Sequence, residues 1–232
     1  MNYPINLDIR DSYLSDLTSA SITNWCLKDE IKIERLVGRG SYGKVYRVKR
    51  IGKLATTILA KKVTLGESRT LSNDFTREFG ILSKLSQSQT TKARDRLIKL
   101  IGIEISQSES GVWHTALYTP FYEHGNLDVY LQNVGCKLVK KDLKVMAKDI
   151  LLILEQLRAS QIIHRDLKPG NIVVSQNNRL LLIDFGSAVE FKHRLAMTGR
   201  ILTTAHVRAP EIVCGLHSYD YAVDVYAAGC VL

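Results

Sequence analysis

Apolar and β-branched residues occur in short runs through the first half of the chain, and glycine-containing turns separate several of them. Five such runs predict strands, at residues 31–37, 45–51, 56–63, 97–103 and 112–119. A helix is predicted over residues 74–85, because Ser72 and Asn73 before it are favourable capping residues. Together these runs predict an antiparallel sheet of five strands with one helix.

The second half of the chain has a helical pattern. After a turn at Gly125 and Asn126, apolar residues recur at helical spacing and predict a long buried helix that leads into a polar segment. The positions predicted to be buried are Leu143, Met146, Ala147, Ile150, Leu154 and Leu157. Residues 1–30 are predicted to be a short helix or a flexible arm.

The composition is typical of a globular protein. The 232 residues suffice for one large domain or two small lobes, and 45% of them are hydrophobic. No apolar run approaches the ~20 residues of a membrane helix, and no basic start precedes an apolar stretch. The four cysteines lack C-x-x-C spacing and are expected to be free thiols in a reducing compartment. An intracellular protein, cytoplasmic or nuclear and without a membrane partner, is therefore expected.

The net charge of +9 has three interpretations. It can serve nucleic-acid binding, attract polyanionic nucleotides and acidic substrates, or simply keep the surface soluble. The basic residues are spread along the chain and do not alternate with aromatic residues, as they do in single-strand binders. Nucleic acid is therefore the less favoured partner.

A glycine-rich run of the form G-x-G-x-x-G-x-V stands between the first two predicted strands. It comprises Gly38, Arg39, Gly40, Ser41, Tyr42, Gly43, Lys44 and Val45. Glycines let a backbone approach phosphates and present its N–H groups to them. An ordinary hairpin turn can contain the same glycines, whereas a dinucleotide-binding turn requires a helix directly after them. A strand is predicted there instead, which argues against the dinucleotide-binding turn.

Two charged residues, Lys62 and Glu78, lie on faces of their predicted elements that they share with apolar residues. Ile58, Ala60 and Lys62 share one face of the third predicted strand, and Lys61 lies on the other. Glu78 lies on the apolar stripe of the predicted helix, where a carboxylate needs a partner. Alternatively, Lys61 and Lys62 are both solvated, and Glu78 lies at the rim of the apolar stripe.

One segment carries groups for phosphoryl transfer. It reads His164-Arg165-Asp166-Leu167-Lys168-Pro169-Gly170-Asn171, and Asp184-Phe185-Gly186 follows 18 residues after Asp166. Phosphoryl transfer from Mg²⁺-bound ATP requires a base, a cation and two oxygen ligands at these offsets. A zinc site is not indicated, because neither a thiolate nor a second histidine is nearby. These motifs, in this order, resemble the catalytic core of eukaryotic-type protein kinases, and the resemblance covers residues 31–232.

The resemblance implies that the first part of the chain binds ATP. Lys62 would contact the phosphates and pair with Glu78. Adenine would bind the carbonyl of Pro120 and the N–H of Tyr122, with Thr119 as gatekeeper, and a proline is tolerated because only its carbonyl is needed. The implied nucleotide-binding residues are Gly38, Arg39, Gly40, Ser41, Tyr42, Gly43, Val45, Ala60, Lys62, Thr119, Pro120, Tyr122 and Val173.

The resemblance places the chemistry itself in the second part. Asp166 would accept the proton of the substrate hydroxyl, and Lys168 would neutralise charge on the transferring phosphoryl group. Asn171 and Asp184 would hold Mg²⁺ between the phosphates. His164 is expected to be a packing residue behind this segment rather than an acid or base.

Three further residues bear on the kinase class. Lys168 and Thr204 match serine/threonine kinases, and Asp224 matches the helix aspartate that ties down the backbone of the catalytic segment. A serine/threonine kinase acting on a protein substrate is therefore expected. An inactive kinase-like binding module is one alternative; a small-molecule kinase of related fold is another, although such enzymes typically lack the counterparts of Arg165 and Lys168.

Regulation and subgroup are further expectations from the resemblance. Arg77 and Arg208 are similar to residues of cyclin-dependent and related kinases, whereas Val189 stands where those kinases often have a basic residue. A phosphate on Thr198 would form charge-assisted bonds to Arg77 and Arg165 and order the activation segment.

The expected fold is α+β and two-lobed. An N-terminal extension at 1–30 would precede a small ATP-binding lobe at 31–122 and a mainly helical large lobe at 123–232. Because the last residues form an apolar helical run, the large lobe is expected to be incomplete, to need a regulatory partner protein or a missing C-terminal segment, and to be poorly soluble alone. The residues expected to anchor this last helix are Val223, Val225, Tyr226 and Val231.

Overall fold

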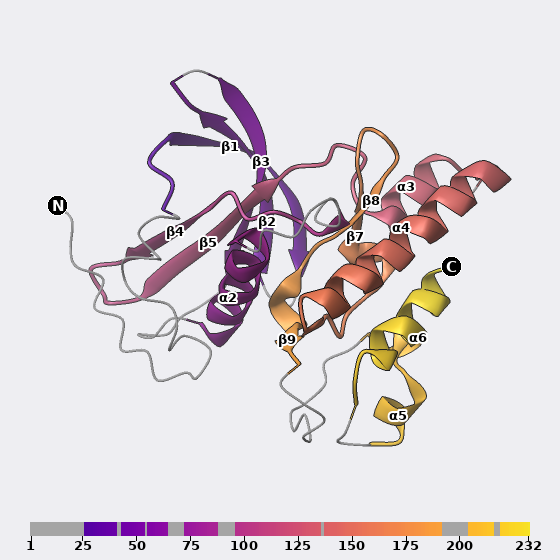
Figure 1. Ribbon diagram of the computed structural model, residues 1–232. Coiled ribbons are helices and arrows are strands. Elements are labelled where there is room, and N and C mark those ends of the chain that lie inside the picture. The colour runs from indigo at the N-terminus through magenta and orange to yellow at the C-terminus, as the bar shows by residue number, and fades with distance from the viewer. Residues whose placement is uncertain are drawn as a thin grey trace. The chain divides into compact units, whose positions relative to one another are not determined.

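The chain divides into two compact units, Met1–Ser86 with Lys99–Phe121 and Gln87–Ile98 with Tyr122–Leu232. The first is an antiparallel sheet with a helix, and the second is mainly helical (Figure 1). The predicted α+β class is confirmed. The computed structural model describes residues 26–40, 43–53, 55–64, 72–87, 96–135, 137–191, 204–215 and 219–232.

The first unit contains the predicted five-stranded sheet. Its strands are β1 Glu30–Gly40, β2 Gly43–Ile51, β3 Thr56–Thr64, β4 Gly102–Gln107 and β5 Trp113–Pro120, and its helix is α2 Asn73–Gln87. The strand order is β1-β2-β3-β5-β4, and every neighbouring pair is antiparallel. Ser72 caps α2 as predicted, because its hydroxyl oxygen accepts a hydrogen bond from the backbone N of Asp74 at 3.3 Å.

The strand predicted at residues 97–103 is wrong in its position. β4 begins only at Gly102, and the residues before it form an irregular buried connection in which the backbone N of Ile98 donates to the carbonyl of Leu182 at 2.9 Å. Ile98 and Leu100 are each 4% exposed. Their apolar character therefore reflects burial of a connection, which a short apolar run does not distinguish from a strand.

The register of the sheet brings five of the predicted nucleotide-binding residues onto one face: Gly38, Val45, Ala60, Lys62 and Thr119. Gly38 lies opposite Val45, Val45 opposite Lys62, and Ala60 opposite Thr119. Directly opposed residues of antiparallel strands project from the same side of a sheet. The other side forms an apolar core that contains Val48, Leu59, Ala116 and Tyr118.

A polar cluster lies on that core side. The hydroxyl of the fully buried Tyr118 donates to Glu104, and Lys61 Nζ pairs with Glu104 at 2.8 Å. Burial, together with this carboxylate, raises the pKa of Tyr118. Burial alone would raise the pKa of Glu104, but the hydrogen bonds from Lys61 and Tyr118 outweigh it and lower that pKa. Lys61 therefore points away from the face that carries Lys62, as its alternation predicts.

Helices and two pairs of short strands build the second unit. Its helices are α3 Leu127–Asn133, α4 Lys140–Ala159, α5 Pro210–Val213 and α6 Ala222–Val231. β6 Ile162–Ile163 pairs with β9 Val189–Glu190, and β7 Ile172–Val174 pairs with β8 Leu180–Leu182. Single 3₁₀ turns are η2 Pro169–Asn171, η3 Phe185–Ser187 and η4 Ala205–Val207. None of the helices in the described ranges is long and apolar enough to cross a membrane.

The predicted long helix is α4, but its buried stripe differs from the prediction. Leu143 is 49% exposed, so the prediction that it is buried is wrong. Two polar side chains, Asp149 and Gln156, are also buried in the stripe, although the pattern of apolar residues did not predict it. The buried residues are Met146, Asp149, Ile150, Ile153, Gln156 and Leu157.

Asp149 is buried because basic groups surround its carboxylate. Arg179 Nη2 and Arg96 Nε donate to Asp149 Oδ1 at 2.6 and 2.8 Å, and the backbone N of Leu180 donates to Oδ2 at 3.0 Å. Burial alone would raise the pKa of Asp149, but the donors from Arg179, Leu180 and Arg96 outweigh it and hold the pKa below its usual value. The cluster ties α4 to β8, the strand that precedes Asp184.

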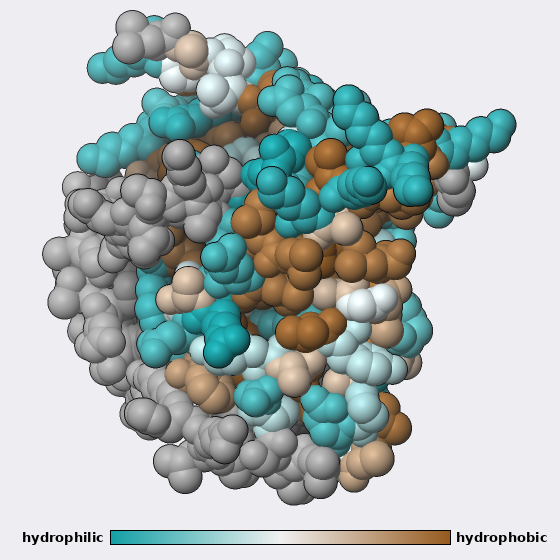
Figure 2. All heavy atoms as spheres, turned by 45° about the vertical axis from the view of Figure 1, so that its right-hand side comes forward, coloured by the Kyte–Doolittle hydropathy of each residue, from teal (hydrophilic) through white to brown (hydrophobic). Residues whose placement is uncertain are grey.

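The last helix, α6, buries Val223 as predicted, but otherwise its buried face differs from the one predicted. Val225 and Tyr226 are 54% and 46% exposed, so the prediction that they anchor the helix is wrong. Exposed apolar side chains are visible on the side of the molecule that carries α4 and α6 (Figure 2). An apolar sequence on all sides of a helix leaves the choice of buried face to the neighbouring elements. The buried residues of α6 are Val223, Asp224, Ala227 and Ala228.

Candidate active site

The glycine-rich run is the turn between β1 and β2. Gly43 has φ +147°, and a Cβ added to it would overlap the carbonyl oxygen of Val63, so this position requires glycine. At Gly38 and Gly40 an added Cβ would meet no atom of the described residues within 4 Å. Packing against the described part of the chain therefore does not explain these two glycines, whereas a phosphate approaching the bare backbone would. The predicted residues Ser41 and Tyr42 lie outside the described ranges.

The predicted pair between β3 and α2 is present. Lys62 Nζ lies 2.6 Å from Glu78 Oε2, and the Glu78 residue is only 5% exposed. A carboxylate on the apolar stripe of α2 thus receives the partner that its burial demands. The ion pair holds the lysine on the face of the sheet that also carries Val45.

The predicted adenine-binding residues fall at the end of β5 and beyond it. Thr119 and Pro120 are the last two residues of β5, and Tyr122 follows them. Tyr122 is partly buried, which raises the pKa of its hydroxyl. Val173 lies in β7, is 9% exposed, and forms an isolated bridge with Asn126.

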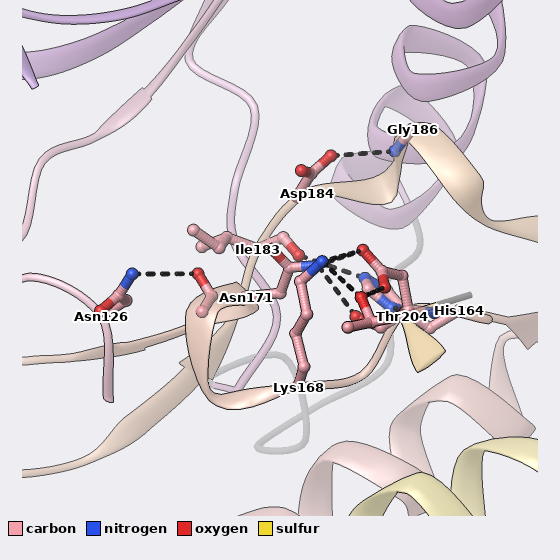
Figure 3. A network of polar contacts seen from close by, with 10 residues as sticks. Asn126, His164, Lys168, Asn171, Ile183, Asp184, Gly186 and Thr204 are labelled. Carbon is pink, nitrogen blue, oxygen red and sulfur yellow. Dashed lines mark hydrogen bonds and ion pairs between the residues drawn. The ribbon is translucent and has the colours of Figure 1, made fainter. Parts of the chain in front are cut away.

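Three side chains of the second unit converge on Asp166. Lys168 Nζ donates to Asp166 Oδ2 and to Thr204 Oγ1, both at 2.8 Å, and Thr204 Oγ1 donates to Asp166 Oδ1 at 2.8 Å. Asn171 Nδ2 donates to Asp166 Oδ2 and to its backbone carbonyl, again at 2.8 Å each. Figure 3 shows Lys168, Asn171 and Thr204 close to one another. Each carboxylate oxygen is therefore held in place, and Asp166 is only 5% exposed.

The β7–β8 hairpin brings the two predicted metal ligands together. Ile172 lies opposite Leu182, so Asn171 falls opposite Ile183, whose backbone N donates to the Asn171 carbonyl at 2.9 Å. Asp184 is the next residue and adopts φ 62°, with its carboxylate accepting from Gly186 N at 3.3 Å (Figure 3). The pairing of two short strands thus places an amide and a carboxylate at the same end of one hairpin.

The donor set of this hairpin end fits Mg²⁺. Both contacts of Asn171 Nδ2 go to Asp166, so Oδ1 is the atom of that amide that can ligate a cation. With Asp184 it supplies oxygen ligands, and Mg²⁺ is commonly held by one or two protein groups plus phosphate oxygens. In the described ranges no group of three or more His, Cys, Asp or Glu side chains is arranged to hold a metal by itself.

His164 is a buried packing residue, as expected. It is fully buried, its Nε2 lies 3.1 Å from the carbonyl of Ile183, and its Nδ1 accepts from the backbone N of Asp166 at 3.3 Å. Those two contacts place the ring proton on Nε2. The ring also packs edge-on against Phe185, with centroids 5.1 Å apart.

Asp224 of α6 holds the backbone of the same segment. Its Oδ2 accepts from His164 N at 2.7 Å, and its Oδ1 accepts from Arg165 N at 2.8 Å. Burial raises the pKa of the Asp224 carboxyl, and these donors act against that increase. The predicted link between this aspartate and the backbone that leads to Asp166 is confirmed.

Comparison with known proteins decides the family. A family model described as protein kinase domain matches residues 31–232. The chain belongs to the protein kinase family. Cyclin-dependent kinase C-2 C of Arabidopsis thaliana is 31% identical over 228 residues, which cover 95% of this chain and 33% of that protein. CTD kinase subunit alpha of Saccharomyces cerevisiae is 29% identical over 196 residues, covering 84% of this chain and 35% of that protein.

The relatives are considerably longer than this kinase chain. Cyclin-dependent kinase 7 of Dictyostelium discoideum, for example, is 29% identical over 208 residues, which cover 88% of this chain and 54% of that protein. The chain thus spans about a third to a half of the length of the curated relatives it matches. Similarity to cyclin-dependent kinases agrees with the subgroup suggested by Arg77 and Arg208.

One arrangement in the kinase was not predicted. The Phe121 ring, next to Pro120, lies within 5.9 Å of the Arg35 guanidinium and 5.5 Å of the Arg47 guanidinium. Arg47 also pairs with Glu34. A period-two reading shows which strand residues share a face, but it does not show that two arginines meet one aromatic ring.

The predicted phosphate-binding arginines of the kinase have other contacts in this structure. Arg77 lies 3.6 Å from Asp74 on α2, and Arg165 donates to the carbonyl of Ser187 at 2.6 Å. Thr198, the residue predicted to carry the phosphate, lies outside the described ranges. Regulation by its phosphorylation stays a prediction.

Proposed function

We propose that this chain is an ATP-dependent serine/threonine kinase that transfers the γ-phosphate to a hydroxyl of a protein substrate. The observation that carries the proposal is the network on Asp166, in which Lys168, Thr204 and Asn171 hold both carboxylate oxygens. A general base must be oriented before it can accept a proton in the transition state. The presence of Lys168 and Thr204 in that network supports the serine/threonine class.

The residues of the second unit would divide the chemistry between them. Asp166 would orient the substrate hydroxyl and take its proton, and Lys168 would balance negative charge on the phosphoryl group in transfer. Asn171 and Asp184 would hold Mg²⁺, which neutralises phosphate charge when it is bound. The segment at 123–232 would thus be the catalytic lobe.

The residues of the first unit would bind the nucleotide. The bare backbone at Gly38 and Gly40 would face the phosphates, and Lys62, held by Glu78, would contribute a positive charge to them. Pro120 would offer its carbonyl to adenine. The segment at 31–122 would thus be the ATP-binding lobe.

Transfer of radioactive phosphate from ATP to a generic basic protein, with and without Mg²⁺, tests the proposal. Asp166→Asn is expected to abolish transfer while leaving ATP affinity in calorimetry unchanged, because the aspartate contacts the nucleophile and not the nucleotide. Asp142→Asn on α4 is the matched control and should keep wild-type turnover. Comparable turnover in Asp166→Asn and wild type, or no transfer by the wild-type chain, would contradict the proposal.

A further inference from the structure

Arg165 has an unusual backbone at a critical place. It has φ 66°, in the left-handed region that residues other than glycine rarely adopt. It also directly precedes Asp166, so its backbone conformation affects the direction in which the Asp166 side chain leaves the main chain. Such a conformation persists only where surrounding contacts determine it.

Three contacts from two segments of the chain, 184–191 and 219–232, hold Arg165. Its backbone N donates to Asp224 at 2.8 Å, its Nε donates to the carbonyl of Ser187 at 2.6 Å, and its Nη1 donates to the hydroxyl of Tyr219 at 3.1 Å. Asp224 secures the main chain, whereas Ser187 and Tyr219 secure the guanidinium. Ser187 follows directly after the Asp184-Phe185-Gly186 motif, so Arg165 links the base to the segment that carries a metal ligand.

Packing fixes the Tyr219 hydroxyl. Tyr219 is 7% exposed and belongs to an apolar cluster with Ile163, Val189, Ala209 and Val223. Tyr219 and Arg165 line a common cavity of about 10 Å³, which has room for a single water at most. Little space is therefore left there for water to replace the Tyr219 hydroxyl.

We propose that Tyr219 is a positioning residue of this kinase, and that its hydroxyl acts through Arg165. It holds the guanidinium on the Ser187 carbonyl, so that Asp166 and the segment after Asp184 keep a fixed relation. The aromatic ring of Tyr219 contributes packing alone, and its hydroxyl fixes the orientation of the Arg165 guanidinium. The consequence for turnover rests on the proposed function, whereas the contact itself does not.

The variant Tyr219→Phe removes the hydroxyl and leaves the ring. The kcat of the full 232-residue chain is expected to fall about tenfold, equivalent to ~1.4 kcal/mol, with KM for ATP unchanged and thermal unfolding close to wild type. Tyr226→Phe on α6 is the matched control: that tyrosine is 46% exposed, and its substitution should change neither kcat nor stability. Unchanged kcat in Tyr219→Phe would overturn the proposal.

A double-mutant cycle distinguishes positioning from packing. Arg165→Lys is expected to lower kcat, and Tyr219→Phe should add little once Arg165 has been replaced, because both changes break the same contact. Fully additive effects would show that Tyr219 acts independently of Arg165 and would refute the proposal.

One measurement needs no activity. In the wild-type chain labelled with ¹⁵N-arginine, the Arg165 Nε–H should exchange slowly with solvent, since it is bonded to the Ser187 carbonyl. Tyr219→Phe should accelerate that exchange, and Tyr226→Phe should not. Fast exchange in the wild type, or no acceleration in Tyr219→Phe, overturns the positioning role. Absence of phosphate transfer by the wild type would instead count against the proposed function.

Discussion

Thr204 offers the sharpest test of the network on Asp166. Its hydroxyl both accepts from Lys168 Nζ and donates to Asp166 Oδ1, each at 2.8 Å, so it bridges the proposed cation and base of the reaction. Thr204→Val keeps the shape of the side chain and removes that bridge alone. The Asp166 contacts from Lys168 Nζ and Asn171 Nδ2 stay in place.

The expected magnitude follows from the contacts that are lost. A hydrogen bond to a charged group contributes roughly 1.5–3 kcal/mol. Thr204 is only partly buried, so water can replace some of this, and we expect about 1–2 kcal/mol, or a loss of roughly 5- to 30-fold in kcat. KM for ATP should not change, because the hydroxyl contacts the base and the lysine rather than the nucleotide-binding residues.

Steady-state phosphate transfer to a basic protein, with ATP varied at fixed Mg²⁺, measures both constants. Thr204→Ser restores the hydroxyl and should recover most of the lost kcat, which makes it the matched control. A kcat of Thr204→Val within twofold of wild type, or a loss confined to KM for ATP, would refute the inference that Thr204 orients Asp166.

Three further changes test other parts of the structure. Lys62→Met should lower turnover by orders of magnitude, whereas Lys61→Met, on the opposite face of β3, should not; equal losses in transfer assays would contradict the assignment. Because the pKa of Asp149 is lowered in the folded state, its contribution to stability is present above the ordinary aspartate pKa of about 4 and is lost as pH falls through the lowered value. Chemical denaturation of Asp149→Asn should therefore show a lower free energy of unfolding at neutral pH and a shallower loss of it on acidification, and parallel pH profiles would exclude this. Gln156→Leu should raise the free energy of unfolding by about 1–3 kcal/mol, because both polar atoms of this 4%-exposed side chain lack hydrogen-bond partners among the described residues. Gln132→Leu on the exposed surface of α3 should change it little, and a destabilised Gln156→Leu would show that the buried amide is in fact satisfied.

The sequence predicted what local patterns control. Alternation along β3 separated Lys62 from Lys61, and helical spacing put Glu78 on a stripe where it required a partner; the structure pairs Lys62 with Glu78 and Lys61 with Glu104. The glycine-rich turn and its two flanking strands were likewise predicted from the sequence. In each case residues within a few positions of one another set the geometry.

What could not be predicted depends on contacts between distant segments. The run at 97–103 is apolar because a connection is buried, not because it pairs as one strand. In α6 nearly every residue is apolar, so nothing in the spacing shows that Val225 and Tyr226 are exposed. Asp149 is charged and yet fully buried, because Arg96 and Arg179 reach it from other elements.

The catalytic segment itself combines both situations. Its residue types and offsets identify it, but its shape depends on partners far along the chain: His164 and Arg165 are held by Asp224, which lies 60 and 59 positions later, and Asp166 by Thr204, which lies 38 positions later. Regular structure within the segment is limited to the 3₁₀ turn at Pro169–Asn171, so local hydrogen bonds alone cannot maintain the left-handed Arg165. The orientation of Asp166, the proposed base, therefore depends on how well α6 is packed. The residues of α6 themselves take no part in the proposed chemistry. Loosening α6 should impair the reaction while every residue of the catalytic motif remains intact.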